Sequence, residues 1–226
     1  MMAQSFAGRT IVLRIDRSPI DEPTTLASDL AFLLERGMRP IVVAPTSEAA
    51  RTYVRTLNRQ SNIAVGLSGA DAALLPASGT QSVGRVQTHI LATLTAAGYI
   101  PVIEPTAYGF AGDDVCVRAD DAAAAIAAAT EAARALFFRA SGGVVDPASQ
   151  ALVADLTPAE ALALADRDDL DAELRATMRA AAYGVRAGVG AAQILDGRIA
   201  HAAIVELLTQ QHLGTQVAGT VYLGGA

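Results

Sequence analysis

Apolar positions along this chain fall into short continuous runs separated by longer segments of helical spacing. The runs Thr10–Ile15, Pro40–Ala44 and Ile63–Leu67 are rich in β-branched residues, a pattern typical of buried strands. Four later runs also predict strands: Tyr99–Glu104, Leu136–Arg139, Ala192–Asp196 and Thr215–Leu223. We expect Val115–Arg118 to be a short extended piece and Tyr108–Asp114 to be a glycine-containing loop.

Helical segments lie between these runs, and several carry start or stop signals. The segment Leu26–Arg36 ends at Gly37, and Ser47 can start a helix that continues to about Arg59. Thr157 and Glu160 have the spacing of a capping box. The remaining predicted helices are Thr88–Ala97, Asp120–Arg134, Asp169–Ala187 and His201–Gln210. Strands that alternate with helices predict an α/β protein with a mostly parallel sheet covered on both faces.

Composition supports a large buried core. Hydrophobic residues make up 52% of the 226 positions and charged residues 18%, and mean hydropathy is +0.34. No uninterrupted apolar run approaches the roughly 20 residues of a membrane span, so we expect no membrane association. The segment Met1–Gly8 has no signal-peptide pattern, and a single cysteine, Cys116, excludes an intrachain disulfide. A cytoplasmic location fits both observations.

Charge narrows the possible chemistry. The net charge is −6 without any basic cluster, which disfavours nucleic-acid binding. All 17 basic residues are arginine, so any mechanism that needs a lysine ammonium is excluded. His89, His201 and His212 do not have the spacing of metal ligands, and we expect no metal site.

Five segments follow one another in a recognisable order. They are Ala64–Asp71 (AVGLSGAD), Val83–Val86 (VGRV), Ala97–Pro105 (AGYIPVIEP), Arg118–Ile126 (RADDAAAAI) and Ala187–Leu207, which contains LDGRIAHA. This ordered set resembles the amino-acid kinase family, and within it the acetylglutamate kinases. The resemblance implies an open three-layer αβα sandwich with one continuous sheet. It also implies an N-terminal lobe (1–112) for the acyl-amino acid and a C-terminal lobe (113–226) for the nucleotide, with the site at the carboxyl ends of the strands. Family members associate through N-terminal helices, so the resemblance implies a homodimer.

The N-terminal half departs from the family where phosphate should bind. By the resemblance, Arg14 stands in the place of a lysine, and Asp16 and Arg17 stand in the places of two glycines. A turn of three glycines is replaced by Pro45–Ser47, where the proline has no N–H to offer a phosphate. A substrate-binding arginine segment of the family is missing between Ser47 and Ile63.

The C-terminal half departs in the same direction. The family's acidic nucleotide-site segment corresponds to Arg139–Gly143, its second lysine to about Thr177, and two asparagines to Cys116 and Arg118. Asp120 keeps the position of a charged catalytic aspartate. We therefore expect no cofactor, with binding of ATP and Mg²⁺ lost.

These correspondences define the candidate residues. Arg14, Asp120 and Cys116 are candidate catalytic groups; the candidate ligand-binding residues are Arg14, Asp16, Arg17, Ser68, Gly69 and Arg118. The charged members form either a salt-bridged remnant or a new anion site. Cys116 is either a small buried hydrophobe or a thiolate nucleophile.

Three functional hypotheses remain open. The first is a pseudokinase that binds a small acidic amino-acid derivative or a partner biosynthetic enzyme. The second is a repurposed enzyme that uses the old cleft for chemistry without ATP. The third is an active acylamino-acid kinase with arginine in place of lysine.

Overall fold

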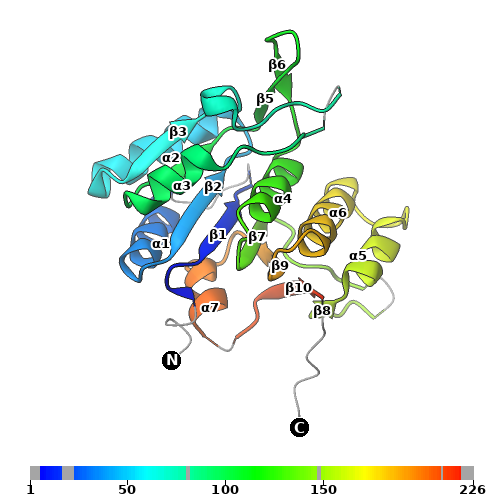
Figure 1. Cartoon of the computed structure of the whole chain (residues 1–226). Coiled ribbons are helices and arrows are strands. Elements are labelled where there is room, and N and C mark those ends of the chain that lie inside the picture. Colours follow the sequence, from blue (N-terminus) through cyan, green and yellow to red (C-terminus); the bar gives the residue numbers. More distant parts are fainter. Residues whose placement is uncertain (1–5, 17–22, 80–81, 147–148, 210, 220–226) are drawn as a thin grey trace.

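A single large sheet organises the part of the chain that the computed structural model describes, namely residues 6–16, 23–79, 82–146, 149–209 and 211–219 (Figure 1). Within these residues the sheet has eight strands. In spatial order they are β3 (Ala64–Leu67), β4 (Ile100–Ile103), β2 (Arg39–Val43), β1 (Thr10–Arg14), β7 (Arg134–Arg139), β9 (Ala191–Asp196), β10 (Gly214–Ala218) and β8 (Asp155–Leu156).

Pairing is parallel throughout the sheet except between β9 and β10. The central strand β1 lies between β2 and β7, so that Leu13 has Val42 on one side and Leu136 on the other. The first four strands in spatial order come from the N-terminal half of the chain and the last four from the C-terminal half. The predicted mostly parallel α/β sheet is therefore confirmed.

Helices cover both faces of the sheet (Figure 1). One face packs against α3 (His89–Ala96), α4 (Ala119–Ala129), α5 (Pro158–Ala165) and α6 (Ala172–Arg186), and the other against α1 (Pro23–Glu35), α2 (Ser47–Ser61) and α7 (Ala202–Leu208). Along β1 the side chains alternate: Val12 packs on the face covered by α3–α6, and Ile11 and Leu13 pack on the face covered by α1, α2 and α7. Because both faces of the sheet are buried, the interior positions of the central strands are all apolar, as in Ile11–Leu13 of β1 and Ala135–Phe138 of β7.

The carboxyl ends of the central strands meet at one edge and carry the polar residues. Asp16 follows β1, Pro45 follows β2, Glu104 follows β4, and Arg139 ends β7. Parallel strands place these positions together although up to 123 residues separate them in sequence. This edge is where open α/β sheets bind their ligands.

Some predicted boundaries were wrong. The helix expected over Asp120–Arg134 ends at Ala129, because Glu131 adopts a left-handed conformation (φ 49°) that stops it, and Arg134 already begins β7. The strand expected to reach Leu223 ends at Ala218; residues 220–223 lie outside the described part.

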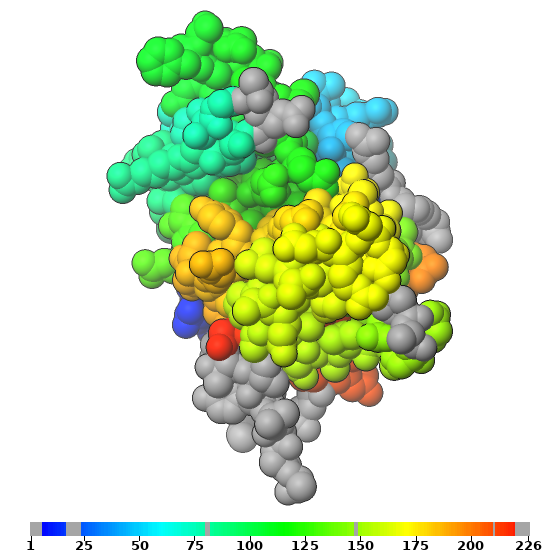
Figure 2. All heavy atoms as spheres, turned by 90° about the vertical axis from the view of Figure 1, so that its right-hand side faces the viewer, coloured from blue at the N-terminus to red at the C-terminus, as the bar shows by residue number. Residues whose placement is uncertain are grey.

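Two short strand pairings were not predicted. The expected loop Tyr108–Asp114 connects β5 (Thr106–Tyr108) and β6 (Asp114–Cys116), which form an antiparallel hairpin. The strand β8 also lacked a sequence signal, since two residues are too few to show a period. The hairpin projects from the body of the molecule, as Figure 2 shows from the side.

Gly69 joins the edge strand β3 to this hairpin. Its N–H donates to Thr106 O at 2.7 Å and its carbonyl accepts from Leu75 N at 3.0 Å. A Cβ at this position would lie 2.8 Å from Ala107 Cα and even closer to Thr106 O. The backbone packing therefore explains the glycine without any ligand.

We expect Gly69→Ala to lower the free energy of unfolding by about 1–3 kcal/mol, because the new methyl group collides with backbone rather than with a movable side chain. Denaturant unfolding measures this. Gly219→Ala is the control, since nothing lies within 4 Å of the added Cβ there. Equal stability of the two variants would contradict the packing argument.

Candidate functional site

A buried ion pair lies at the centre of the carboxyl edge. Arg14, the last residue of β1, places its Nε 2.9 Å from Oδ1 of Asp120 in the first turn of α4. The Arg14 side chain is 8% exposed and that of Asp120 is 1% exposed. The Nε–H bond is not aligned with the oxygen, so the contact is electrostatic rather than a hydrogen bond. Arg14 Nη1 donates to Phe138 O at 3.2 Å.

Arg118 extends this pair toward solvent. Its Nη2 lies 3.2 Å from Asp120 Oδ2 and 3.0 Å from Glu173 Oε2 on α6. Burial lowers the pKa of Arg118, but Glu173, Asp120 and Asp121 outweigh that effect and raise the pKa above its ordinary value. Asp120 therefore lies between two arginines, of which Arg14 corresponds by the resemblance to a lysine and Arg118 to an asparagine.

Further polar contacts hold the surrounding elements. Ala140 N donates to Asp16 Oδ2 at 3.1 Å, and Arg14 Nη1 lies 3.5 Å from Asp16 Oδ1. Arg139 Nη1 donates to the hydroxyl of Thr177 at 3.0 Å, and that hydroxyl lies 3.4 Å from Asp120 Oδ1. The network thus links β1, β7, α4 and α6.

These residues border a cavity of about 470 Å³, which we call the ion-pair cleft. Its lining residues are Arg14, Asp16, Pro45, Val117, Arg118, Ala119, Asp120 and Glu173. Two arginines and three carboxylates give it a formal charge of −1. Each arginine is already paired, so an incoming anion would have to compete with carboxylates of the protein.

The structure brings together four predicted site residues and separates the others. Arg14, Asp16, Arg118 and Asp120 line the ion-pair cleft, as the sequence predicted. Cys116 is exposed at the end of β6 and does not line it. The alternative of a small buried hydrophobe at Cys116 is therefore wrong, because the side chain is exposed, and the alternative of a thiolate nucleophile stays a prediction. Arg17 lies outside the described residues.

A second cavity, of about 380 Å³, lies on the other side of the β2–α2 turn. Ser68, a predicted ligand-binding residue, lines it together with Arg51, Arg55, Asp71 and Glu104. Neither arginine was among the predicted site residues, because the family's arginine segment was expected to be missing between Ser47 and Ile63. Their four-residue spacing places both arginines on one face of α2, which begins at the carboxyl edge of the sheet, and this spacing could have indicated a binding site.

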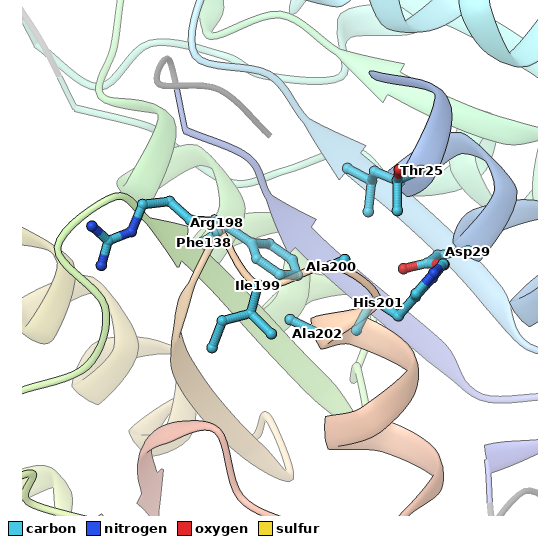
Figure 3. Close-up of a pocket in the computed structure, with 11 residues that line it drawn as sticks. Thr25, Asp29, Phe138, Arg198, Ile199, Ala200, His201 and Ala202 are labelled. Carbon is cyan, nitrogen blue, oxygen red and sulfur yellow. The ribbon is translucent and has the colours of Figure 1, made fainter. Parts of the chain in front are cut away.

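A third cavity, of about 130 Å³, lies between α1 and α7 (Figure 3). Asp29 and His201 lie side by side in its lining, with 2.6 Å between Oδ1 and Nδ1, while Arg198 points away and pairs with Asp196. Burial raises the pKa of Asp29, and His201 offsets part of that rise. The cavity is below the ~300 Å³ at which ligand pockets begin, and we assign it a structural role.

Within the described ranges, no three His, Cys, Asp or Glu side chains gather closely enough to hold a metal ion. None of the helices described is long and apolar enough to cross a membrane.

The fold and the cleft at its carboxyl edge define an open α/β sandwich of the kinase type. The model of the amino acid kinase family matches residues 54–196, and the chain belongs to this family. The acetylglutamate kinase of Zymomonas mobilis is 34% identical over 74% of this chain and 62% of its own length. That of Erythrobacter litoralis is 28% identical over 95% of this chain and 91% of its own. The acetylglutamate kinase-like relationship is therefore confirmed.

Solved structures agree on the fold. The N-acetylglutamate synthase of Neisseria gonorrhoeae, complexed with coenzyme A and N-acetyl-glutamate, superposes with a TM-score of 0.82 at 20% identity. The match covers 98% of this chain and 62% of that one. The carbamate kinase of Giardia lamblia bound to AMP-PNP superposes with a TM-score of 0.67 at 11% identity, covering 95% and 99%. The present chain thus spans less than two thirds of the Zymomonas relative and of the synthase.

We expect Asp120→Asn to lower the free energy of unfolding by about 3–5 kcal/mol, because it leaves Arg14 buried without its closest counter-charge. Thermal and urea unfolding check this. Asp168→Asn is the matched control, since it breaks a pair with Arg175 in which the carboxylate is 99% exposed. The control should change stability by less than about 1 kcal/mol. A loss for Asp120→Asn as small as that of the control would disprove the central role of the pair.

The raised pKa of Asp29 gives a pH-dependent prediction. In the folded protein this carboxyl keeps its proton above its ordinary pKa of 3.8, so its contribution to stability is present below that pH and is lost as pH rises through the folded pKa. Asp29→Asn removes this titration but keeps an acceptor for His201. Between about pH 4 and 6, below the usual histidine pKa, the stability of Asp29→Asn relative to the unmodified protein should increase with pH. A difference that stays flat or falls across this range would refute the prediction; urea unfolding at each pH measures it.

Proposed function

We propose that this chain is an amino acid kinase family member that does not transfer phosphoryl groups and instead binds a small acidic amino-acid derivative. The observation that carries the proposal is the state of Asp120. Its carboxylate is almost fully buried and lies against both Arg14 and Arg118. The positive charges of Arg14 and Arg118 are therefore already neutralised by a carboxylate of the protein, at the position that corresponds to the family's catalytic aspartate.

Charge and backbone chemistry support the loss of phosphoryl transfer. A transferred phosphoryl group needs positive charge and N–H donors aimed at its oxygens. The ion-pair cleft has a formal charge of −1, and Pro45, which lines it, contributes no N–H. A magnesium–ATP complex would meet Asp16 and Glu173 without any lysine in the chain to offset them.

The relatives support the ligand class. Two of them are named acetylglutamate kinase, and a protein with the same fold was crystallised with N-acetyl-glutamate. Two cavities along the carboxyl edge of this chain still contain arginines. Arginine presents paired donors that match a carboxylate. A ligand with one or more carboxylates therefore fits this edge better than a nucleotide does. Association as a homodimer or with a biosynthetic enzyme is a further part of the proposal.

Calorimetric titration tests both halves. We expect no heat from MgATP up to millimolar concentrations, and a binding signal from at least one of N-acetyl-L-glutamate and L-glutamate. No acyl phosphate should form when ATP and either acid are supplied together. The acetylglutamate kinase of Zymomonas mobilis serves as the positive control in the transfer assay. Millimolar or tighter binding of MgATP, or formation of an acyl phosphate, would contradict the proposed loss of phosphoryl transfer. If neither acid binds, the proposed ligand class is wrong, and a protein partner becomes the next candidate.

A further inference from the structure

The cavity beside the β2–α2 turn, which we call the Arg51–Arg55 pocket, contains charged side chains that have no partner among the described residues. Its lining residues are Ser47, Ala50, Arg51, Val54, Arg55, Gly66, Leu67, Ser68, Asp71 and Glu104. Its volume of about 380 Å³ lies within the ~300–1,000 Å³ range of small-molecule sites. It adjoins the site edge, because Pro45 lines the ion-pair cleft and Ser47 lines this pocket.

Two positive charges lie on one side of the pocket. Arg51 and Arg55 are one helical turn apart on α2 and both line the cavity. Neither guanidinium has an ion pair or hydrogen bond with any described residue. Like charges at this spacing destabilise a helix unless an anion lies between them. Each guanidinium can donate two parallel N–H hydrogen bonds to a carboxylate.

Glu104 brings a negative charge to the same pocket from a different element. Glu104 directly follows β4, is half-buried, and its carboxylate makes no hydrogen bond or ion pair among the described residues. Its backbone is fixed, since its N–H donates to Leu67 O at 3.0 Å and its carbonyl accepts from Thr106 N at 2.8 Å. None of the salt bridges in the described part of the chain joins Glu104 to either arginine. The pocket therefore keeps positive and negative groups apart.

The other acid in the pocket is partly engaged. Asp71 Oδ2 accepts from Ser68 N at 2.7 Å and from Ser68 Oγ at 2.9 Å, which closes the turn after β3. This contact fixes the turn as one wall of the pocket and makes Glu104, neither of whose carboxylate oxygens bonds to a described residue, the less engaged of the two acids. The ion-pair cleft differs in this respect, since Arg14, Arg118, Asp120 and Glu173 pair with one another there.

From this separation of charge we infer that the Arg51–Arg55 pocket binds an α-amino acid that carries a second carboxylate and a free ammonium group. Arg51 and Arg55 bind the carboxylates, and Glu104 binds the ammonium. The inference deepens the ligand-binding half of the proposed function and rests on it. It is independent of whether phosphoryl transfer is lost, and it selects a free amino acid over its N-acylated form.

The experiment is isothermal titration of three probes into the full chain: L-glutamate, N-acetyl-L-glutamate and glutarate. The first has two carboxylates and an ammonium, the second has its nitrogen acylated, and the third has no nitrogen. L-glutamate should bind at least tenfold more tightly than either of the others. Arg51→Ala and Arg55→Ala should each weaken L-glutamate binding at least tenfold.

Two further variants make the test specific. Arg59→Ala is the matched control, because Arg59 is an exposed arginine one turn further along α2 that does not line the pocket. It should leave all three affinities unchanged. Glu104→Gln should weaken L-glutamate binding at least tenfold and leave glutarate binding unchanged or tighter. Circular dichroism and thermal unfolding verify that each variant is folded.

Distinct results overturn each part. Wild-type affinity in both Arg51→Ala and Arg55→Ala, or equal losses in Arg59→Ala, would show that these arginines are solvated charges rather than ligands. Equal binding of N-acetyl-L-glutamate and L-glutamate, with Glu104→Gln unaffected, would remove the ammonium site. Absence of binding by all three probes would overturn the inference as a whole. Phosphoryl transfer from MgATP would instead contradict the proposed loss of kinase activity and would leave the results on Arg51 and Arg55 unaffected.

Discussion

The buried contact between Arg14 and Asp120 is the constraint on which the carboxyl edge of this protein depends. It joins the central strand β1 to the start of α4, and through Arg118 it reaches Glu173 on α6. Two charges removed from water are tolerated only when they remain together, because desolvation is costly and the loss of one partner leaves the other uncompensated. The pair therefore sets both the geometry and the charge of the ion-pair cleft.

This constraint separates the edge into two regions of different chemistry. On one side of the β2–α2 turn, arginines and carboxylates neutralise one another. On the other side, Arg51, Arg55 and Glu104 line a pocket, and none of the three pairs with an opposite charge in the part of the chain that the structure describes. Ligands exchange water for protein contacts, so a group whose charge is already matched offers less to a ligand than an unpaired one. We infer that binding chemistry in this chain has moved toward the unpaired side.

Much of the site was predictable because it depended on order along the chain. Arg14 ends β1 and Asp16 closely follows it, while Arg118 and Asp120 lie at the start of α4, and parallel strands place such positions at one edge. The alternative that Cys116 is buried was wrong, because this residue lies in the β5–β6 hairpin, whose strands of three residues are too short to show a period. Arg51 and Arg55 were missed, because an exposed arginine pair on a helix has the same local pattern whether it faces solvent or a cavity.

The sequence by itself determined the α/β class, the alternation of strands and helices, the absence of lysine and the family to which the chain belongs. These follow from the period of apolar residues and from motifs in a fixed order, which are local properties. Only the tertiary structure decided which charges pair with one another and which remain available. Arg14 and Asp120 lie 106 positions apart in sequence, and Arg118 and Glu173 lie 55 apart. Such pairings depend on strand order, helix packing and burial, and no local pattern of residues specifies them.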